Sequence, residues 1–145
     1  MQSKPGEYDY LPHTADAKFR AYGKTLEECF RNAGRAMFAI ITDIEKVKGK
    51  QRVAVTVKAT NREALLFDLL DQLLYLLDTE SLLLHDLEGL EIKESKGEFV
   101  LTCIAVGDKY KNYETHGDVK AVTYSDMKIE KLPDGKWLCQ VVVDL

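Results

Sequence analysis

The 145-residue sequence predicts an α+β fold in which a mostly antiparallel or mixed sheet packs against two main helices. Two segments show the helical spacing of apolar residues, and several others show the alternation that is typical of strands with one buried face. Helices and strands do not alternate strictly along the chain, which disfavours a parallel sheet built from β-α-β units. We expect a single domain over residues 1–145, because a chain of this length supports one hydrophobic core.

Two helices are predicted from capping signals and apolar spacing. Thr25 with Glu28 forms a capping box before the first helix, and Thr60 with Glu63 forms another before a longer helix that runs to about Asp78. Burial of each inward-facing leucine stabilises a fold by about 1.5–3 kcal/mol, so the second helix is expected at the centre of the core. Its inward-facing leucines are Leu65, Leu66, Leu69, Leu70, Leu73, Leu74 and Leu77.

The remaining regular segments have the period-two pattern of strands. Predicted strands cover residues 8–12, 17–22, 53–59, 90–95, 98–106, 119–124, 127–132 and 137 to the end of the sequence, with a bend or bulge expected between 124 and 127. Lys96-Gly97 and Pro133-Asp134-Gly135 are turn signals between neighbouring strands. Such short connections favour antiparallel pairing.

Charge and composition exclude several classes of protein. The formal net charge of -4 and the sequence pI of about 5.4 argue against strong direct binding of nucleic acid, which needs a clustered basic surface. The N-terminal residues lack the apolar run of a signal peptide, and no segment approaches the roughly 20 apolar residues of a membrane span. Cys29, Cys103 and Cys139 form no C-x-x-C pair and are expected as buried free thiols. We therefore expect a soluble cytoplasmic protein.

Two polar segments far apart in the sequence carry carboxylates. His13-Thr14-Ala15-Asp16 occupies a corner between predicted strands, where it serves either as an Asx-type turn or as a functional site. Asp144 lies beside the α-carboxylate of Leu145, and these two charges repel unless a cation or a basic side chain lies between them. Oxygen ligands of this kind favour calcium or magnesium over zinc. The alternative is a solvated, frayed chain end.

A third polar segment, Tyr113 to Tyr124, contains His116 and Lys120 and is either an acid–base site or a solvated connection. The sequence has no Walker A loop, dinucleotide-binding loop, nucleophile elbow or H-E-x-x-H motif. His85 and Asp86, which follow a run of leucines, are expected on the solvated surface.

These segments together resemble the archease family. The resemblance is carried by Tyr8-Asp9-Tyr10-Leu11-Pro12-His13-Thr14-Ala15-Asp16, by His116-Gly117 with Val119-Lys120-Ala121-Val122-Thr123-Tyr124, and by Val141-Val142-Val143-Asp144-Leu145. Three motifs in the same order, over essentially the whole chain, are more specific than any one of them. One departure is Ser125, which stands where family members often have a histidine, so no role of that histidine is carried over.

The resemblance implies a protein cofactor that is not itself an enzyme. Archeases assist RtcB-type RNA ligases in tRNA splicing by promoting guanylylation of the ligase and multiple turnover. The implied metal site, usually assigned to Ca²⁺, maps onto Asp16, Asp144 and the terminal Leu145. Lys120, with His13 and His116, is implied as a candidate for action on the ligase.

Two other functions remain open from the sequence. One is a chaperone or adaptor for a tRNA-modifying methyltransferase, a role that is compatible with ligase activation. The other is a small metal-dependent hydrolase that uses Asp16, Asp144 and His13 around a metal-bound water. No nucleophile or phosphate-binding loop accompanies these residues, which disfavours the hydrolase.

Overall fold

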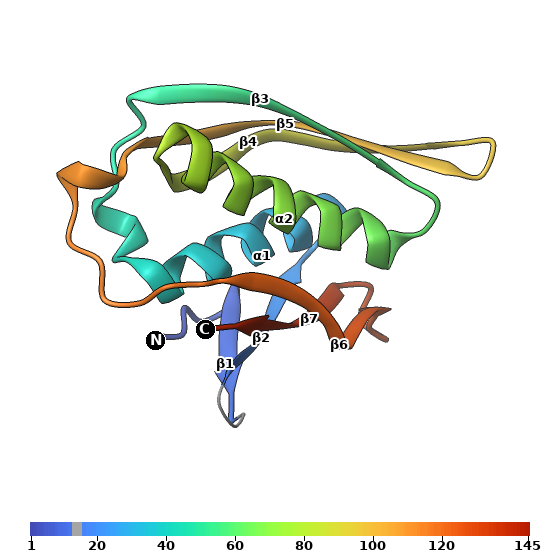
Figure 1. Cartoon of the computed structure of the whole chain (residues 1–145). Helices are drawn as coiled ribbons and strands as arrows, with labels where there is room; N and C mark the ends of the chain where they lie inside the picture. Colours follow the sequence, from blue (N-terminus) through green and yellow to red (C-terminus); the bar gives the residue numbers. More distant parts are fainter. Residues whose placement is uncertain (13–15) are drawn as a thin grey trace.

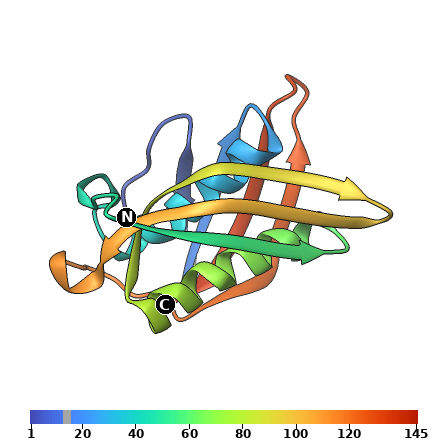
Figure 2. The same cartoon turned by 90° about the horizontal axis from the view of Figure 1, so that it is seen from above.

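Two antiparallel sheets enclose a layer of two helices in the computed structural model, which describes residues 1–12 and 16–145 (Figure 1). The elements in chain order are β1 (Tyr8–Leu11), β2 (Asp16–Gly23), α1 (Leu26–Ile41), the 3-10 helix η1 (Ile44–Lys46), β3 (Gln51–Ala59), α2 (Arg62–Glu80), β4 (Leu82–Ser95), β5 (Glu98–Lys109), the 3-10 helix η2 (Tyr110–Asn112), β6 (Ala121–Lys131) and β7 (Trp137–Asp144). One sheet has the order β1-β2-β7-β6 and the other β3-β5-β4. Seen from above, the strands of the two sheets run across each other with the helices between them (Figure 2).

The predicted α+β class, the antiparallel pairing and the two main helices are confirmed, but the strands form two sheets where one was expected. The reason lies in α2, whose buried leucines form a band that covers about half of the circumference of the helix and is wide enough to contact both sheets. They are Leu65, Leu66, Leu69, Leu70, Leu73, Leu74 and Leu76, whereas the predicted Leu77 is half-buried. A band this broad is buried only where elements of both sheets pack against the helix.

The N-terminal cap predicted for α1 is confirmed, whereas the cap predicted for α2 was wrong. Thr25 is the N-cap of α1, and its hydroxyl accepts a hydrogen bond from the Glu28 N–H at 3.1 Å. The prediction of Thr60 as the second cap was wrong by one residue. Asn61 caps α2 through a 2.8 Å bond from the Ala64 N–H to its side-chain oxygen, because asparagine is at least as good an N-cap as threonine.

The longest strand begins earlier than predicted. β4 starts at Leu82 and includes the buried Leu82 to Leu84, so the leucine run after α2 is a strand that packs on the helices. The expectation that His85 and Asp86 are solvated was wrong, because both are half-buried members of β4. In β6, a register shift between Thr123 and Lys128 confirms the predicted bulge.

Two further sequence predictions can be compared with the structure. Cys29, Cys103 and Cys139 are free and buried, as expected. Neither α1 nor α2 is long and apolar enough to cross a membrane, a finding that covers the residues described.

The position of Leu69 at the centre of the helix layer gives a stability prediction. Its side chain is fully buried, so Leu69→Ala is expected to lower the free energy of unfolding by about 2–5 kcal/mol through lost burial and a residual cavity. Urea denaturation measures the change. Lys58→Ala, on the exposed side of β3, is the control and should change the same quantity by less than about 0.5 kcal/mol. Equal effects of the two substitutions would contradict this account of the core.

Candidate functional site

The pairing of β2 with β7 brings the first and last polar segments of the chain together. The two strands are antiparallel, and their register places Asp16 directly opposite Asp144. In an antiparallel pair, residues directly opposite each other point to the same face with Cβ atoms about 4.5–5.5 Å apart. Two of the three predicted metal ligands are therefore neighbours, although 127 positions separate them in the numbering of the chain.

Burial along the two strands shows which face carries this pair. Ala17 and Phe19 on β2, and Val141 and Val143 on β7, are buried with almost no exposed area and face the helices. Because side chains alternate along a strand, Asp16 and Asp144 point to the outer face of the sheet. Leu145 follows Asp144 with 42% of its surface exposed, so its terminal carboxylate is at the same edge.

The start of β6 completes this edge. Ala121 lies opposite Asp144 on the other side of β7, and the Lys120 N–H donates a 2.8 Å hydrogen bond to the Asp144 backbone oxygen. Lys120 itself is exposed. The backbone of the predicted partner-contacting lysine is therefore fixed beside the predicted metal ligand.

The outer face also holds polar residues that the sequence did not single out. Lys18 lies on the same face as Asp16, and its Nζ is 3.2 Å from the Asp126 carboxylate. Asp126 belongs to the β6 bulge and has a left-handed backbone with φ of 51°. The Gln140 side chain bonds the Asp126 carbonyl at 2.7 Å and accepts a 3.0 Å bond from Arg20 Nε. The bulge was predictable, but the side chains that meet across it depend on the register of three strands.

The two predicted site histidines, His13 and His116, are not seen at the Asp16–Asp144 edge among the residues that the structure describes. His13 is outside the residues that the structure describes. His116 is at the C-terminal end of α1, where its N–H donates to the Ile41 carbonyl at 2.9 Å. The next residue has to be glycine, since a Cβ on Gly117 would come within 2.5 Å of the Ile40 carbonyl oxygen. His116 also lines an open cleft of about 730 Å³ with residues of the N-terminal segment and of the α1–η1 turn.

The donor chemistry at the Asp16–Asp144 edge fits a hard divalent cation. The side chains offer carboxylate oxygens, and the terminal carboxylate of Leu145 adds a third anionic group. Calcium prefers oxygen donors of this kind. No cluster of three or more histidine, cysteine, aspartate or glutamate side chains suited to a metal occurs among residues 1–12 and 16–145. The site would therefore depend on the chain terminus, and on water or partner groups, for further ligands.

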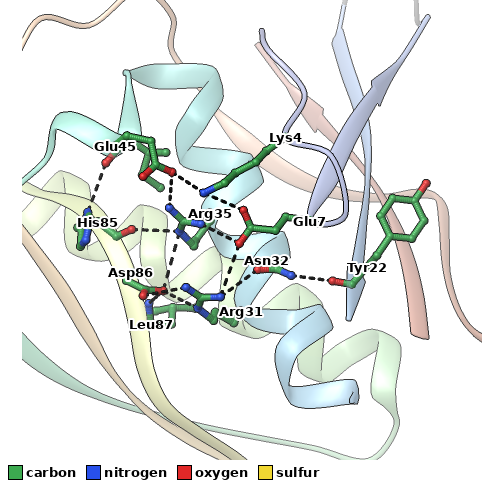
Figure 3. Close-up of polar contacts among 11 residues, drawn as sticks. Lys4, Glu7, Tyr22, Arg31, Asn32, Arg35, Glu45, His85, Asp86 and Leu87 are labelled. Atoms are coloured by element: carbon green, nitrogen blue, oxygen red, sulfur yellow. Dashed lines mark hydrogen bonds and ion pairs between the residues drawn. The ribbon is translucent and has the colours of Figure 1, made fainter. Parts of the chain in front are cut away.

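A separate charge network lies between α1 and its neighbours (Figure 3). The Arg35 guanidinium, in a residue only 3% exposed, bonds the Glu7 carboxylate at 3.1 Å and the Glu45 carboxylate at 2.8 Å. Arg31 makes two bonds, of 2.7 and 3.0 Å, to the carboxylate of Asp86 on β4. These contacts join the N-terminal segment, α1, η1 and β4.

The charged groups of the network are hydrogen-bonded to one another, and these contacts stabilise the fold. Burial would raise the pKa of Asp86, but the hydrogen bonds and charge of Arg31 outweigh it and hold that pKa below its usual value. Removal of one partner would leave the other charge partly buried without its counter-ion, which is destabilising. We therefore assign these residues a structural role, which corrects the expectation of a solvated Asp86. No local sequence pattern indicated this network, because its members come from four separate segments.

Known proteins resemble this chain over its full length. The archease protein family model matches residues 8–145. Protein archease from Methanosarcina barkeri is 43% identical over 147 residues, which cover 100% of both chains, and protein archease from Pyrococcus furiosus is 39% identical over 141 residues, which cover 96% of this chain and 99% of that protein. The solution structure of a Methanobacterium thermoautotrophicum protein has a TM-score of 0.83 at 35% identity and covers 97% of this chain and 99% of its own. The crystal structure of a Thermotoga maritima archease, described as a possible chaperone, shares the fold with a TM-score of 0.57 at 20% identity, covering 100% of this chain and 98% of its own.

Glu45 gives the charge network a measurable pH dependence. Hydrogen bonds from Lys4 and then Arg35 lower the pKa of Glu45 from 4.5 to about 2, against the opposing effect of burial. Because the folded-state pKa is below the unfolded value, Glu45 contributes its full stability above pH 4.5 and loses it as the pH falls through about 2. Urea denaturation over this range should show a shallower loss of stability for Glu45→Gln than for the unmodified chain. The neighbouring exposed carboxylate provides the control Asp43→Asn, and identical curves for the unmodified chain and Glu45→Gln would refute the assignment.

Proposed function

The chain belongs to the archease protein family, and from this premise we propose that it is a non-enzymatic, metal-binding cofactor of an RtcB-type RNA ligase. In this proposal it acts in the cytoplasm during tRNA splicing, where it promotes guanylylation of the ligase and multiple turnover. The observation that supports the proposal most directly is the β2–β7 register, which places Asp16 opposite Asp144 at the chain terminus. The exposed Lys120 is fixed beside this pair.

The proposed metal is Ca²⁺, held by the carboxylates of Asp16, Asp144 and the terminal Leu145. Calcium takes 6–8 oxygen ligands, so water or groups of the partner complete its coordination. When bound, the ion would neutralise carboxylates that otherwise repel each other and fix the chain end on the sheet. The fixed end then presents one defined surface to the ligase.

The residues of the chain act on the ligase by selecting one of its conformations. A partner shifts a conformational equilibrium only as far as it binds one state better than the other. The ammonium of Lys120 is proposed to contact the nucleotide-accepting state of the ligase, with His13 and His116 as further contact candidates. The absence of a nucleophile from the proposed ligand set favours activation over hydrolysis.

Metal binding provides the first test. We expect Asp144→Ala, Asp16→Ala and a C-terminal extension beyond Leu145 each to lower Ca²⁺ affinity by at least about tenfold, or 1.4 kcal/mol, in calorimetric titration. The thermal unfolding of each variant should be nearly unchanged, because Asp144 and Leu145 are exposed and Asp16 points away from the helices. Glu94→Ala, on the exposed β4–β5 hairpin, is the control. Full affinity in the extended chain would defeat the role of the terminal carboxylate.

Multiple-turnover ligation tests the function itself. The cognate ligase is assayed alone, with the unmodified chain, and with Asp144→Ala or Lys120→Ala. We expect the unmodified chain to raise the turnover rate and the amount of guanylylated ligase, and Asp144→Ala to do neither. Lys120→Ala should retain Ca²⁺ binding but lose activation, because its side chain is proposed to contact the ligase and not the metal. If the unmodified chain does not change the turnover rate of a competent ligase, the proposed function is refuted.

A further inference from the structure

Helix α2 has one face that neither sheet covers. The helix lies between β3 and β6, which are edge strands of the two sheets, and this side of it is open in Figure 1. Asp68, Asp71, Tyr75 and Asp78 follow one another at helical spacing along this side. Asp71, Tyr75 and Asp78 are exposed, and Asp68 is half-buried.

This side of the helix carries an uncompensated negative charge. Three of the five acidic residues of α2, Asp68, Asp71 and Asp78, lie on this side, and the helix has one arginine. The arginine is Arg62, whose guanidinium lies over the rings of Phe99 and Trp137 at 5.4 and 5.5 Å, at the N-terminal end of the helix. No ion pair to Asp68 or Asp71 occurs within the described part of the chain.

Aromatic side chains on the same side are unusually exposed. Tyr75 exposes 58% of its surface and Tyr124, on β6, exposes 54%. The ring of Tyr124 is stacked on that of Phe67 with centroids 4.2 Å apart and an interplanar angle of 7°. Rigid, exposed aromatic residues of this kind are the usual anchors of protein interfaces.

The pKa values of Asp68 and Tyr124 are both raised on this side of the helix. Partial burial and then the like charge of Asp71 raise the pKa of Asp68 above its usual value. Burial and the charge of Asp68 also raise the pKa of Tyr124. A positively charged partner would relieve this repulsion on binding.

We infer that Phe67, Asp68, Asp71, Tyr75 and Tyr124, here called the α2 face, form a docking surface for a basic segment at the rim of the RNA-binding channel of the ligase. This inference rests on the proposed function. An enzyme that holds RNA needs lysine and arginine side chains along its channel to neutralise phosphates. The α2 face offers the complementary charge, with aromatic side chains that bury against the stems of those residues.

The α2 face is distinct from the Asp16–Asp144 edge but connected to it. Asp144 points away from the helices, whereas α2 contacts the opposite face of the same sheet. β6 joins the two regions, since Ala121 pairs with Asp144 and Tyr124 stacks on Phe67. The two surfaces have separate roles: the α2 face supplies affinity, and the carboxylate edge with Lys120 supplies activation.

Equilibrium binding to the cognate ligase separates these roles. The fluorescently labelled chain is titrated with ligase, and the double variant Asp68→Asn/Asp71→Asn and the variants Tyr75→Ser and Tyr124→Ser are compared with the unmodified chain. We expect each to weaken binding by about tenfold. Tyr75→Phe should keep the affinity for the ligase. Added salt should weaken the binding of the unmodified chain more than that of the double variant, because salt screens exposed charges. The matched charge control is Glu94→Gln/Glu98→Gln on the exposed β4–β5 hairpin, which should bind normally.

Each outcome has a defined meaning. Weakened binding of the α2-face variants, with Asp144→Ala still bound but inactive, supports the inference. Unchanged binding of the α2-face variants to a ligase that binds the unmodified chain overturns the inference and leaves the proposed function standing. Failure of the unmodified chain to bind the ligase overturns both. Concentration-dependent self-association that the same substitutions abolish would assign the face to a second copy of the chain instead.

Discussion

The helix layer between two sheets is the constraint on which the other features of this protein depend. A helix that contacts two sheets needs a broad apolar band, and the buried leucines of α2 cover about half of its circumference. Burial of this kind supplies the main favourable free energy of folding. It also fixes which face of each sheet is inside, so the outward-pointing side chains of β2 and β7 are set by the packing of Phe19 and Val141 against α1.

The candidate site is a consequence of that packing. Ala17 and Val143 are buried and paired, so their neighbours Asp16 and Asp144 are forced to the outer face as an adjacent pair of carboxylates. A slip of one residue in the register would turn every side chain of the strand to the other face, which the apolar inner residues prevent. The core therefore holds these two carboxylates at close range, and the proposed cation would neutralise them. Stability and the proposed metal affinity have the same structural origin.

Charge has three different roles in this small molecule. Around the buried Arg35, carboxylates and guanidinium groups from four segments are paired, so they stabilise the arrangement of those segments. At the Asp16–Asp144 edge, carboxylates meet at the end of the chain beside Lys120. On the α2 face, Asp68 and Asp71 remain together with exposed aromatic residues. Burial and the presence of a partner distinguish these cases, although the residue types are the same.

The local elements could be predicted from the amino-acid sequence. Apolar period, caps and turns identified both helices, most strands and the β6 bulge, because these signals arise from residues close together in the chain. The Thr60 cap and the start of β4 were mispredicted, since two adjacent polar residues compete as caps and a leucine run suits helix or strand. The sequence motifs identified Asp16, Asp144 and Lys120 as candidates. That these residues lie together, and that Asp86 pairs with Arg31, follows from the packing of distant segments. Pairing between distant segments depends on how whole elements pack, and no local pattern records it.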